Sequence, residues 1–398
     1  MSDRGRAFLI VMDSAGIGGA PDADRYFNGD LPDTGANTLG HIALLRGLAM
    51  PCLDRLGLGA AIRLATGLKA PGLSAEPAGL WGMAIEKSRG KDTPSGHWEL
   101  AGVPVPWDWH VFPDLQSSFP PDLVARIAAL AGTEGILGNC HASGTEIIAR
   151  LGVEHLHSGW PICYTSVDSV LQIAAHEEHF GLERLMSLCA GVAELVHPMR
   201  VGRVIARPFT GPPEGFRRTA RRRDFALPVP GRTILDLAVE AGRVTHAIGK
   251  IGDIFSHRGI CHLHKGQSDA DLAAHLIRLA DEAEPGSLTF ANFVEFDSIY
   301  GHRRDVRGYG LALEWFDTVA AQMLARLRPG DLAIFTADHG NDPTWPGTDH
   351  TREAVPVLGW GGGPLAIGRV QFADVGASVA AHLGIALPAA GHSFMTVS

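Results

Sequence analysis

The sequence predicts an α/β protein with a mostly parallel sheet, helices on both faces of that sheet, and an inserted α+β cap domain. Apolar runs of strand length alternate with amphipathic stretches of helical period through much of the chain. Three of these runs lead to an aspartate, which is typical of parallel strands that end at a ligand site. Two proline-containing turns, at residues 104–106 and 228–231, bracket a middle region of different character.

Length and composition limit the possible classes of protein. A chain of 398 residues is long for one hydrophobic core, so we expect a catalytic core of residues 1–108 and 229–398 and a cap of residues 109–228. The formal net charge of −9 argues against a nucleic-acid partner. No apolar run approaches the roughly 20 residues of a membrane span. The five scattered cysteines form no C-x-x-C pair, which fits reduced thiols in a cytoplasm.

The first element is a buried strand at residues 7–12, followed at once by Asp13 and a glycine-rich turn. A dinucleotide-binding turn would need another glycine where Pro21 stands, so the turn does not predict a nucleotide cofactor. Further on, a helix is expected at residues 39–45, because Thr38 is a good N-cap ahead of an apolar periodic stretch.

The segment at residues 90–99 is dense in glycine, charge and small hydroxyls. Thr93 and Ser95 both offer a hydroxyl on a turn whose exposed backbone N–H groups suit an anion or a metal. The structural alternative, which this segment alone favours, is a Ser/Thr N-cap with Pro94 at the first helical position. The spacing of the residues leaves the choice between the two hydroxyls open.

The cap region predicts strands at residues 170–175 and 201–207 and closes with five arginines within residues 217–223. A solvated surface is the default interpretation of such a basic run. The more specific interpretation is that a few of these arginines bind phosphate, because a guanidinium group can form two parallel hydrogen bonds to phosphate oxygens.

The second half of the chain alternates strands and helices. The strand at residues 287–296 ends at Asp297, and the strand at residues 332–335 runs into Asp338 and His339. The other expected elements are a helix at residues 234–241, a strand at 244–248, and helices at 269–283 and 311–327.

The three strand-end aspartates can converge, because the carboxyl ends of parallel strands meet at one sheet edge. Three ionised carboxylates in one crevice would repel one another, and two divalent cations would compensate that charge. Oxygen and nitrogen donors without thiolate suit manganese, zinc, iron or magnesium. The six candidate ligands are Asp13, Asp297, His302, Asp338, His339 and His350. The paired histidines at 155/157, 176/179 and 262/264 lack such carboxylates and are interpreted as surface or cap residues.

Six segments, in order and nearly from end to end, resemble the phosphopentomutase family of the alkaline phosphatase superfamily. They are residues 13–18 (DSAGIG), 91–93 (KDT), 164–170 (YTSVDSV), Asp297 with 300–305 (YGHRRD), 337–343 (ADHGNDP) and 347–353 (GTDHTRE). The resemblance implies an alkaline-phosphatase-like core with two Mn²⁺ ions and a mobile cap. It also implies an isomerase of nucleoside catabolism that interconverts ribose 1-phosphate, or 2-deoxyribose 1-phosphate, and the 5-phosphate.

The same resemblance implies roles for individual residues. Thr93 matches the family's phosphorylated nucleophile, and a sugar bisphosphate would be the activator. One metal site would use Asp13, Asp338 and His339 with the Thr93 oxygen, and the other would use Asp297, His302 and His350. The pentose-contacting loop matches Ser166, Asp168 and Val170, and the distal phosphate matches Arg203, Arg218 and Lys250. We expect a monomer that acts on small pentose phosphates, without a nucleic-acid or membrane partner.

Other functions compete with this one. A metal-dependent phosphatase or phosphodiesterase would use the same two-metal core with water as the acceptor. A cofactor-independent phosphoglycerate mutase is disfavoured by Thr93 and by the length of the chain. A non-catalytic sugar-phosphate-binding protein should have lost metal ligands, and none of the six is missing. Residues 257–265, which include the sequence Cys-His-Leu-His-Lys, depart from the family and leave the substrate preference open.

Overall fold

The computed structural model describes residues 5–114, 116–166 and 169–395 and divides the chain into two compact units. The core unit comprises Met1–Pro106 and Val229–Ser398, and the cap unit comprises Trp107–Pro228. Within the described ranges, no helix combines the length and apolar character needed to cross a membrane.

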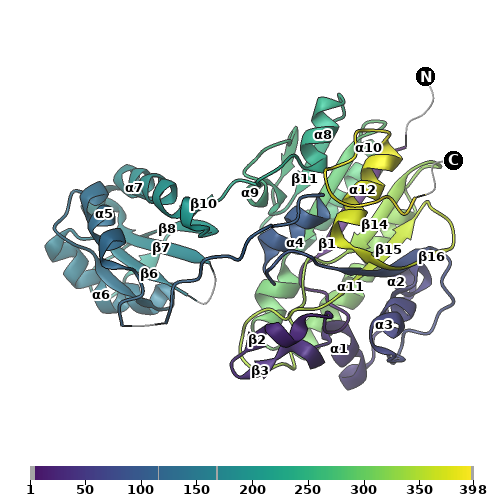
Figure 1. Cartoon of the computed structure of the whole chain (residues 1–398), viewed down its shortest axis with the longest axis horizontal. Coiled ribbons are helices and arrows are strands. Elements are labelled where there is room, and N and C mark those ends of the chain that lie inside the picture. The colour runs from purple at the N-terminus through teal and green to yellow at the C-terminus, as the bar shows by residue number, and fades with distance from the viewer. Residues whose placement is uncertain (1–4, 115, 167–168, 396–398) are drawn as a thin grey trace. The chain divides into compact units, whose positions relative to one another are not determined.

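The core unit is built on an eight-stranded sheet in the order β12-β11-β13-β1-β14-β15-β4-β16 (Figure 1). Its central strand β1 runs parallel to both neighbours, β13 and β14, whereas β15 is antiparallel to β14 and β4. The sheet is therefore mostly parallel, as predicted. The strands are β1 (Ala7–Met12), β4 (Leu80–Ile85), β11 (Thr245–Ile248), β12 (His262–His264), β13 (Leu288–Phe293), β14 (Leu332–Thr336), β15 (Val355–Trp360) and β16 (Leu365–Gln371).

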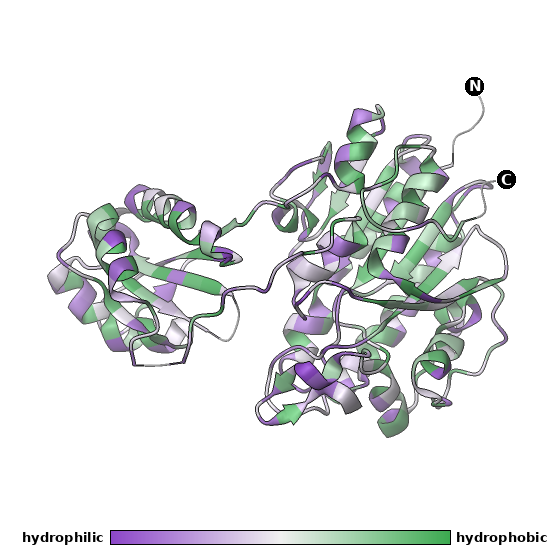
Figure 2. Cartoon of the chain, viewed as in Figure 1, coloured by the Kyte–Doolittle hydropathy of each residue, from purple (hydrophilic) through white to green (hydrophobic). Residues whose placement is uncertain are grey.

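Helices cover both faces of this sheet, which confirms the predicted α/β class (Figure 1). One group surrounds α11 and includes α1, α2 and α10, and the other surrounds α12 and includes α4 and α8. The central strands are hydrophobic along their length, because they are buried on both sides (Figure 2). The helices are α1 (Thr38–Arg46), α2 (Pro51–Leu56), α3 (Leu58–Thr66), α4 (Thr93–Leu100), α8 (Ile234–Glu240), α9 (Ile251–Ile254), α10 (Asp269–Glu282), α11 (Val306–Leu324) and α12 (Phe372–Leu383).

The cap unit has its own sheet, in the order β10-β8-β7-β6-β5 with β9 paired to β8. Separate apolar clusters pack on the two faces of this sheet: one includes residues of α5 and α7, and the other includes residues of α6. The cap therefore has a hydrophobic core of its own. Its elements are α5 (Pro121–Ala131), β5 (Leu137–His141), α6 (Gly144–Ser158), β6 (Ile162–Thr165), β7 (Val170–His176), α7 (Leu182–Val196), β8 (Arg203–Thr210), β9 (Arg217–Arg218) and β10 (Arg223–Ala226).

The first helix begins differently from the prediction. Its N-cap is Asn37, whose side chain accepts from the backbone N–H of Gly40 at 3.0 Å, and Thr38 is already helical. The Thr38 hydroxyl instead donates to the buried carboxylate of Glu353 at 2.7 Å. The expected Thr38 cap was wrong because a distant acid, which local spacing does not reveal, takes this hydroxyl.

Candidate metal centre and nucleophile

Three aspartates lie buried at one edge of the core sheet. Asp13 follows β1 directly, and Asp338 stands two residues beyond the end of β14. Asp297 was predicted to end the third strand directly. It lies instead in the π-helical turn η5 (Phe296–Gly301), which follows β13. Because β13, β1 and β14 are adjacent parallel strands, all three carboxylates reach the same edge.

Three imidazoles join these carboxylates. The Nε2 atom of His339 lies 3.5 Å from Asp13 Oδ1 and 3.3 Å from Asp338 Oδ2. The Nε2 atoms of His302 and His350 lie 3.1 and 3.4 Å from oxygens of Asp297. The two subclusters meet where the rings of His339 and His350 stack at 4.0 Å. The structure thus brings together all six residues that the sequence marked as candidate ligands.

The donor atoms fit divalent cations. Asp13 Oδ1 and Asp338 Oδ2 are buried and accept no hydrogen bond, an expensive state for a carboxylate oxygen. Burial, followed by the charges of Asp338 and Asp297, raises the pKa of Asp13 well above its ordinary value. Among the described residues, two groups offer ligand atoms within 4.8 Å of one another. These groups are Asp13, Asp338 and His339, and Asp297, His339 and His350.

His302 and His350 are both held with Nε2 facing the cluster. His302 Nδ1 lies 2.6 Å from the Thr348 carbonyl, and His350 Nδ1 lies 2.8 Å from the Lys91 carbonyl. When Nδ1–H donates to these carbonyls, Nε2 keeps its lone pair for a metal, the usual arrangement around a ligating histidine. Burial lowers the pKa of His339 to about 4, which keeps that imidazole in its neutral, ligating form.

Several supporting side chains escaped the sequence analysis. Asn292 donates to Asp13 Oδ2 at 2.8 Å, and Asn341 donates to Asp297 Oδ1 at 2.7 Å. The ring of His97, fully buried, lies 2.9 Å from the Thr93 carbonyl and 3.1 Å from Asp338 Oδ2 through Nδ1. The one available signal was Asn292, a polar residue within the apolar run of β13.

The Thr93 hydroxyl lies beside the cluster, with Oγ1 3.3 Å from His339 Nε2. Thr93 is the first residue of α4. Because Asp92 is the N-cap of this helix, the Thr93 hydroxyl is not used for capping. Ser95 is buried, and its hydroxyl donates to Asp92 Oδ2 at 2.9 Å. A Cβ on Gly96 would lie 2.1 Å from the Asp338 carbonyl oxygen, so only glycine lets α4 approach this closely. The Thr93 hydroxyl therefore lies beside the cluster, and the Ser95 hydroxyl is bound to Asp92.

The predicted substrate-contacting residues fall in both units. In the cap, Val170 and Arg203 pair in the parallel register of β7 and β8, Ser166 lies just beyond the end of β6, and Arg218 is exposed on β9. Asp168 lies outside the described residues. In the core, the exposed Lys250 follows β11, and its charge helps to lower the pKa of Asp13 against the larger effect of burial. A cation at this position lies near enough to influence the carboxylate cluster.

Arg304 holds the loop that carries His350. Its guanidinium donates to the carbonyls of Gly347 at 2.8 Å and Asp349 at 3.0 Å, and also to the Asn341 side chain. We expect Arg304→Lys to weaken divalent-metal affinity by about 10-fold, because a single ammonium cannot span these acceptors. Metal titration of the apo-protein checks this, with Arg303→Lys as the control because Arg303 is exposed. Equal affinities in the two variants would contradict it.

Asp269 fixes the turn between β13 and Asp297. Its carboxylate accepts from the backbone N–H groups of Val294 and Glu295, both at 3.2 Å. Burial, followed by the charge of Glu295, raises the pKa of Asp269 from 3.8 to about 7. Between these values the native chain holds a proton that the unfolded chain has released, so this carboxyl lowers stability as pH rises through the window.

We therefore expect the stability difference between the parent and Asp269→Asn to change with pH. From pH 4 to pH 7 the parent should lose unfolding free energy relative to the variant, which cannot ionise at this position. Urea unfolding at pH 5 and pH 8, with the same metal load, measures the difference. A difference that stays constant would mean that Asp269 keeps an ordinary pKa.

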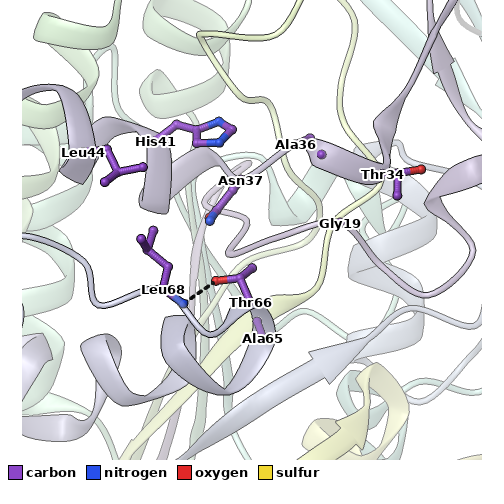
Figure 3. A pocket seen from close by; sticks show the side chains of 10 residues that line it. Gly19, Thr34, Ala36, Asn37, His41, Leu44, Ala65, Thr66 and Leu68 are labelled. Atoms are coloured by element: carbon purple, nitrogen blue, oxygen red, sulfur yellow. Dashed lines mark hydrogen bonds between the residues drawn. The ribbon is translucent and has the colours of Figure 1, made fainter.

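A separate cavity of about 440 Å³ lies beside α1 (Figure 3). His41, Asn37 and Thr34 give it polar walls, and Leu44 and Leu68 give it apolar ones. The Nδ1 atom of His41 lies 2.6 Å from Asp342 Oδ2. None of the six candidate metal ligands lines this cavity, so it is distinct from the cluster.

Comparisons with known proteins agree with this chemistry. The metalloenzyme superfamily matches residues 238–387, a range that holds Asp297, His302, Asp338, His339 and His350. A phosphopentomutase of Methylobacterium sp. (strain 4-46) is 56% identical over 410 residues, covering 98% of this chain and 100% of that protein. A phosphopentomutase of Agrobacterium fabrum is 54% identical over 411 residues, with the same coverage.

Solved structures with similar chains include the PH0037 protein from Pyrococcus horikoshii, at a TM-score of 0.48 and 11% identity. That match covers 96% of this chain and 98% of the other. A phosphoglycerate mutase of Leishmania mexicana matches with a TM-score of 0.47 and 14% identity, over 99% and 98% of the two chains. The full-length identity to curated relatives decides the assignment. The chain belongs to the phosphopentomutase family of isomerases.

Proposed function

We propose that this phosphopentomutase interconverts the 1- and 5-phosphates of ribose or 2-deoxyribose by way of a phosphate carried on Thr93. The observation that carries the proposal is the position of the Thr93 hydroxyl. Its Oγ1 lies 3.3 Å from His339 Nε2, beside the six candidate metal ligands. A hydroxyl at this place can be activated and then release a phosphate without side-chain acid–base catalysis.

Two divalent cations complete the site, and we propose Mn²⁺. Bound cations would lower the pKa of the Thr93 hydroxyl and neutralise charge on the transferring phosphate. Asp13, Asp338 and His339 would hold one ion together with the Thr93 oxygen. Asp297, His302 and His350 would hold the other. The set of oxygen and nitrogen donors, without a thiolate, suits manganese.

The reaction would use two phosphoryl transfers. In the first, the P–O bond to Thr93 breaks and the phosphorus bonds to the free hydroxyl of the pentose monophosphate, whose proton passes to the Thr93 oxygen. The product is a 1,5-bisphosphate. In the second, the Thr93 oxygen bonds to the other phosphorus, the bond from that phosphorus to the sugar oxygen breaks, and the Thr93 proton passes to the sugar oxygen, which gives the isomeric monophosphate and restores the phosphoenzyme. A sugar bisphosphate would phosphorylate enzyme that has lost its phosphate.

The substrate contacts that we propose complement this chemistry. Ser166, Asp168 and Val170 would contact the pentose. Arg203, Arg218 and Lys250 would bind the distal phosphate, because cationic side chains match its charge. We further propose a cytoplasmic monomer without nucleic-acid or membrane partners. The five cysteines form no disulfide in the structure, in keeping with a reducing compartment.

One assay tests the proposal. The Mn²⁺-loaded chain is given ribose 1-phosphate with a catalytic amount of a sugar bisphosphate, and ribose 5-phosphate and free phosphate are both measured. We expect isomer formation to exceed phosphate release by orders of magnitude and to require the bisphosphate. Release of phosphate as the main product would instead make the chain a phosphatase, because water would then be the acceptor.

A further inference from the structure

A group of histidines gathers at the edge of the core sheet formed by β11 and β12. The two strands are parallel, with His246 opposite His262 and Ile248 opposite His264. Because side chains alternate along a strand, His262 and His264 project from the same face. The rings of His246 and His262 stack at 5.1 Å, and those of His246 and His264 at 5.4 Å. From the sequence, His262 and His264 are interpreted as surface or cap residues, and His246 is given no role.

We propose that His246 and His264 form an accessory binding site for a divalent transition metal such as Zn²⁺, Ni²⁺ or Cu²⁺. His246 Nδ1 lies 3.2 Å from His264 Nε2. Two nitrogens bound to one ion at about 2.0–2.1 Å, with a near-tetrahedral angle between the bonds, stand roughly 3.2–3.4 Å apart. The two imidazoles therefore already have the separation that a shared ion requires.

The surroundings of His246 match those of a metal ligand. Its other nitrogen, Nε2, lies 2.7 Å from Glu284 Oε2. An N–H donated to this carboxylate leaves Nδ1 with its lone pair directed at His264, the carboxylate–histidine arrangement found around bound metals. Glu284 would thus orient the ring and increase its basicity without contacting the ion.

The two histidines differ in exposure, because His246 is 5% exposed and His264 is half-buried. His262 is exposed and stacks on the His246 ring, and water would fill the remaining coordination positions. His275 is not part of the site, because its Nε2 lies 3.2 Å from the Lys265 carbonyl and its Nδ1 lies 3.4 Å from Arg278. In the metal-free chain, His264 Nε2–H donates to His246 Nδ1, so an ion between them would require the His264 proton to move to Nδ1, which lies 3.5 Å from Arg278.

Both imidazoles are neutral at physiological pH. Burial, followed by the neighbouring His246, lowers the pKa of His264 to about 4, and burial also lowers the pKa of His246. A neutral imidazole needs no deprotonation before it binds a metal. With imidazole donors and no carboxylate in direct reach, affinity should follow the general order for divalent metals, in which Mn²⁺ binds most weakly. This accessory site therefore differs in preference from the oxygen-rich cluster.

A bound ion would tie β12 to β11 just ahead of Lys250. The backbone N–H of Gly249 already donates to the His264 carbonyl at 3.0 Å. A metal bridge between the same strands would hold the edge strand in place and resist local opening. We expect it to stabilise this edge without being required for turnover, since none of the proposed nucleophile or ligand residues belongs to it.

The test uses the Mn²⁺-saturated enzyme titrated with Zn²⁺ against a chromophoric chelator. The electron paramagnetic resonance signal of free Mn²⁺ reports any displacement from the catalytic cluster in the same samples. We expect the parent to bind one Zn²⁺ beyond the Mn²⁺ released. His264→Ala should abolish this extra equivalent, and Glu284→Gln should weaken it by 10-fold or more. His275→Ala is the matched control and should keep it.

Mutase activity with Mn²⁺ alone shows that each variant is folded, and we expect it to match the parent in all three. Two results would overturn the inference. One is that the parent binds no Zn²⁺ beyond the Mn²⁺ released. The other is that His264→Ala keeps the extra equivalent with parental affinity, since the ion would then bind elsewhere.

Discussion

Thr93→Ala is expected to lower mutase turnover by at least about 10³-fold, equivalent to a loss of about 4 kcal/mol of transition-state stabilisation. The change removes the only oxygen of this side chain, and in the proposed reaction that oxygen carries the phosphate. No phosphoenzyme should form when the variant is incubated with a sugar bisphosphate. Intact-mass measurement of the chain and the steady-state rate with ribose 1-phosphate check the two parts of the prediction.

Ser95→Ala is the matched control, because it removes the other hydroxyl of the same helical turn. The Ser95 hydroxyl donates to Asp92 Oδ2, so its loss should loosen the start of α4 and reduce turnover only a few-fold. Metal content must stay at the parental level in both variants. Full turnover by a metal-loaded Thr93→Ala chain, or loss of phosphorylation only in Ser95→Ala, would exclude Thr93 as the nucleophile.

The sequence alone does not distinguish the Thr93 hydroxyl from the Ser95 hydroxyl. Thr93, Pro94 and Ser95 fit the start of a helix, and local spacing does not say which residue caps it. In the structure Asp92 caps α4, which commits Ser95 to Asp92 and leaves Thr93 beside His339. At α1 the deciding contact is a distant one, because the Thr38 hydroxyl donates to Glu353 and Asn37 is the cap.

The strand-end aspartates were predictable because buried parallel strands have a strong local signature. Asp13 and Asp338 lie where the apolar runs of β1 and β14 placed them. Asp297 lies four residues beyond β13, because the Asp269 carboxylate binds the N–H groups of Val294 and Glu295 and starts the turn early. Such a partner, 25 residues distant in sequence from Val294, leaves no local pattern.

The supporting contacts around the ligands were also beyond the sequence. Asn292 and His97 reach the cluster from β13 and α4, and nothing in their spacing links them to Asp13 or Asp338. The burial of individual histidines could not be predicted from the sequence either. His155 and His176, interpreted as surface or cap residues, are 1% and 3% exposed and are hydrogen bonded within the cap. A polar side chain can be buried when the fold supplies its partners, which are distant in sequence.

The second large effect is expected at the two ends of β14. Asp338, at the carboxyl end, is 0% exposed and has an oxygen without a hydrogen bond, whereas Asp331, at the amino end, is 3% exposed and pairs with Arg6 at 2.6 Å. We expect Asp338→Asn to reduce kcat/KM by at least about 100-fold, because a neutral amide is a poor metal ligand and leaves the ion's charge uncompensated. Metal content should fall in parallel.

Asp331→Asn should have the opposite profile. It leaves the buried Arg6 guanidinium without its carboxylate, so the free energy of unfolding should fall by about 3 kcal/mol or more. Metal content and turnover of the folded fraction should remain at the parental level. Urea unfolding, metal analysis and steady-state rates on the same preparations separate the two cases. Equal metal loss in both variants would mean that the cluster depends on the stability of β14 and not on direct ligation by Asp338.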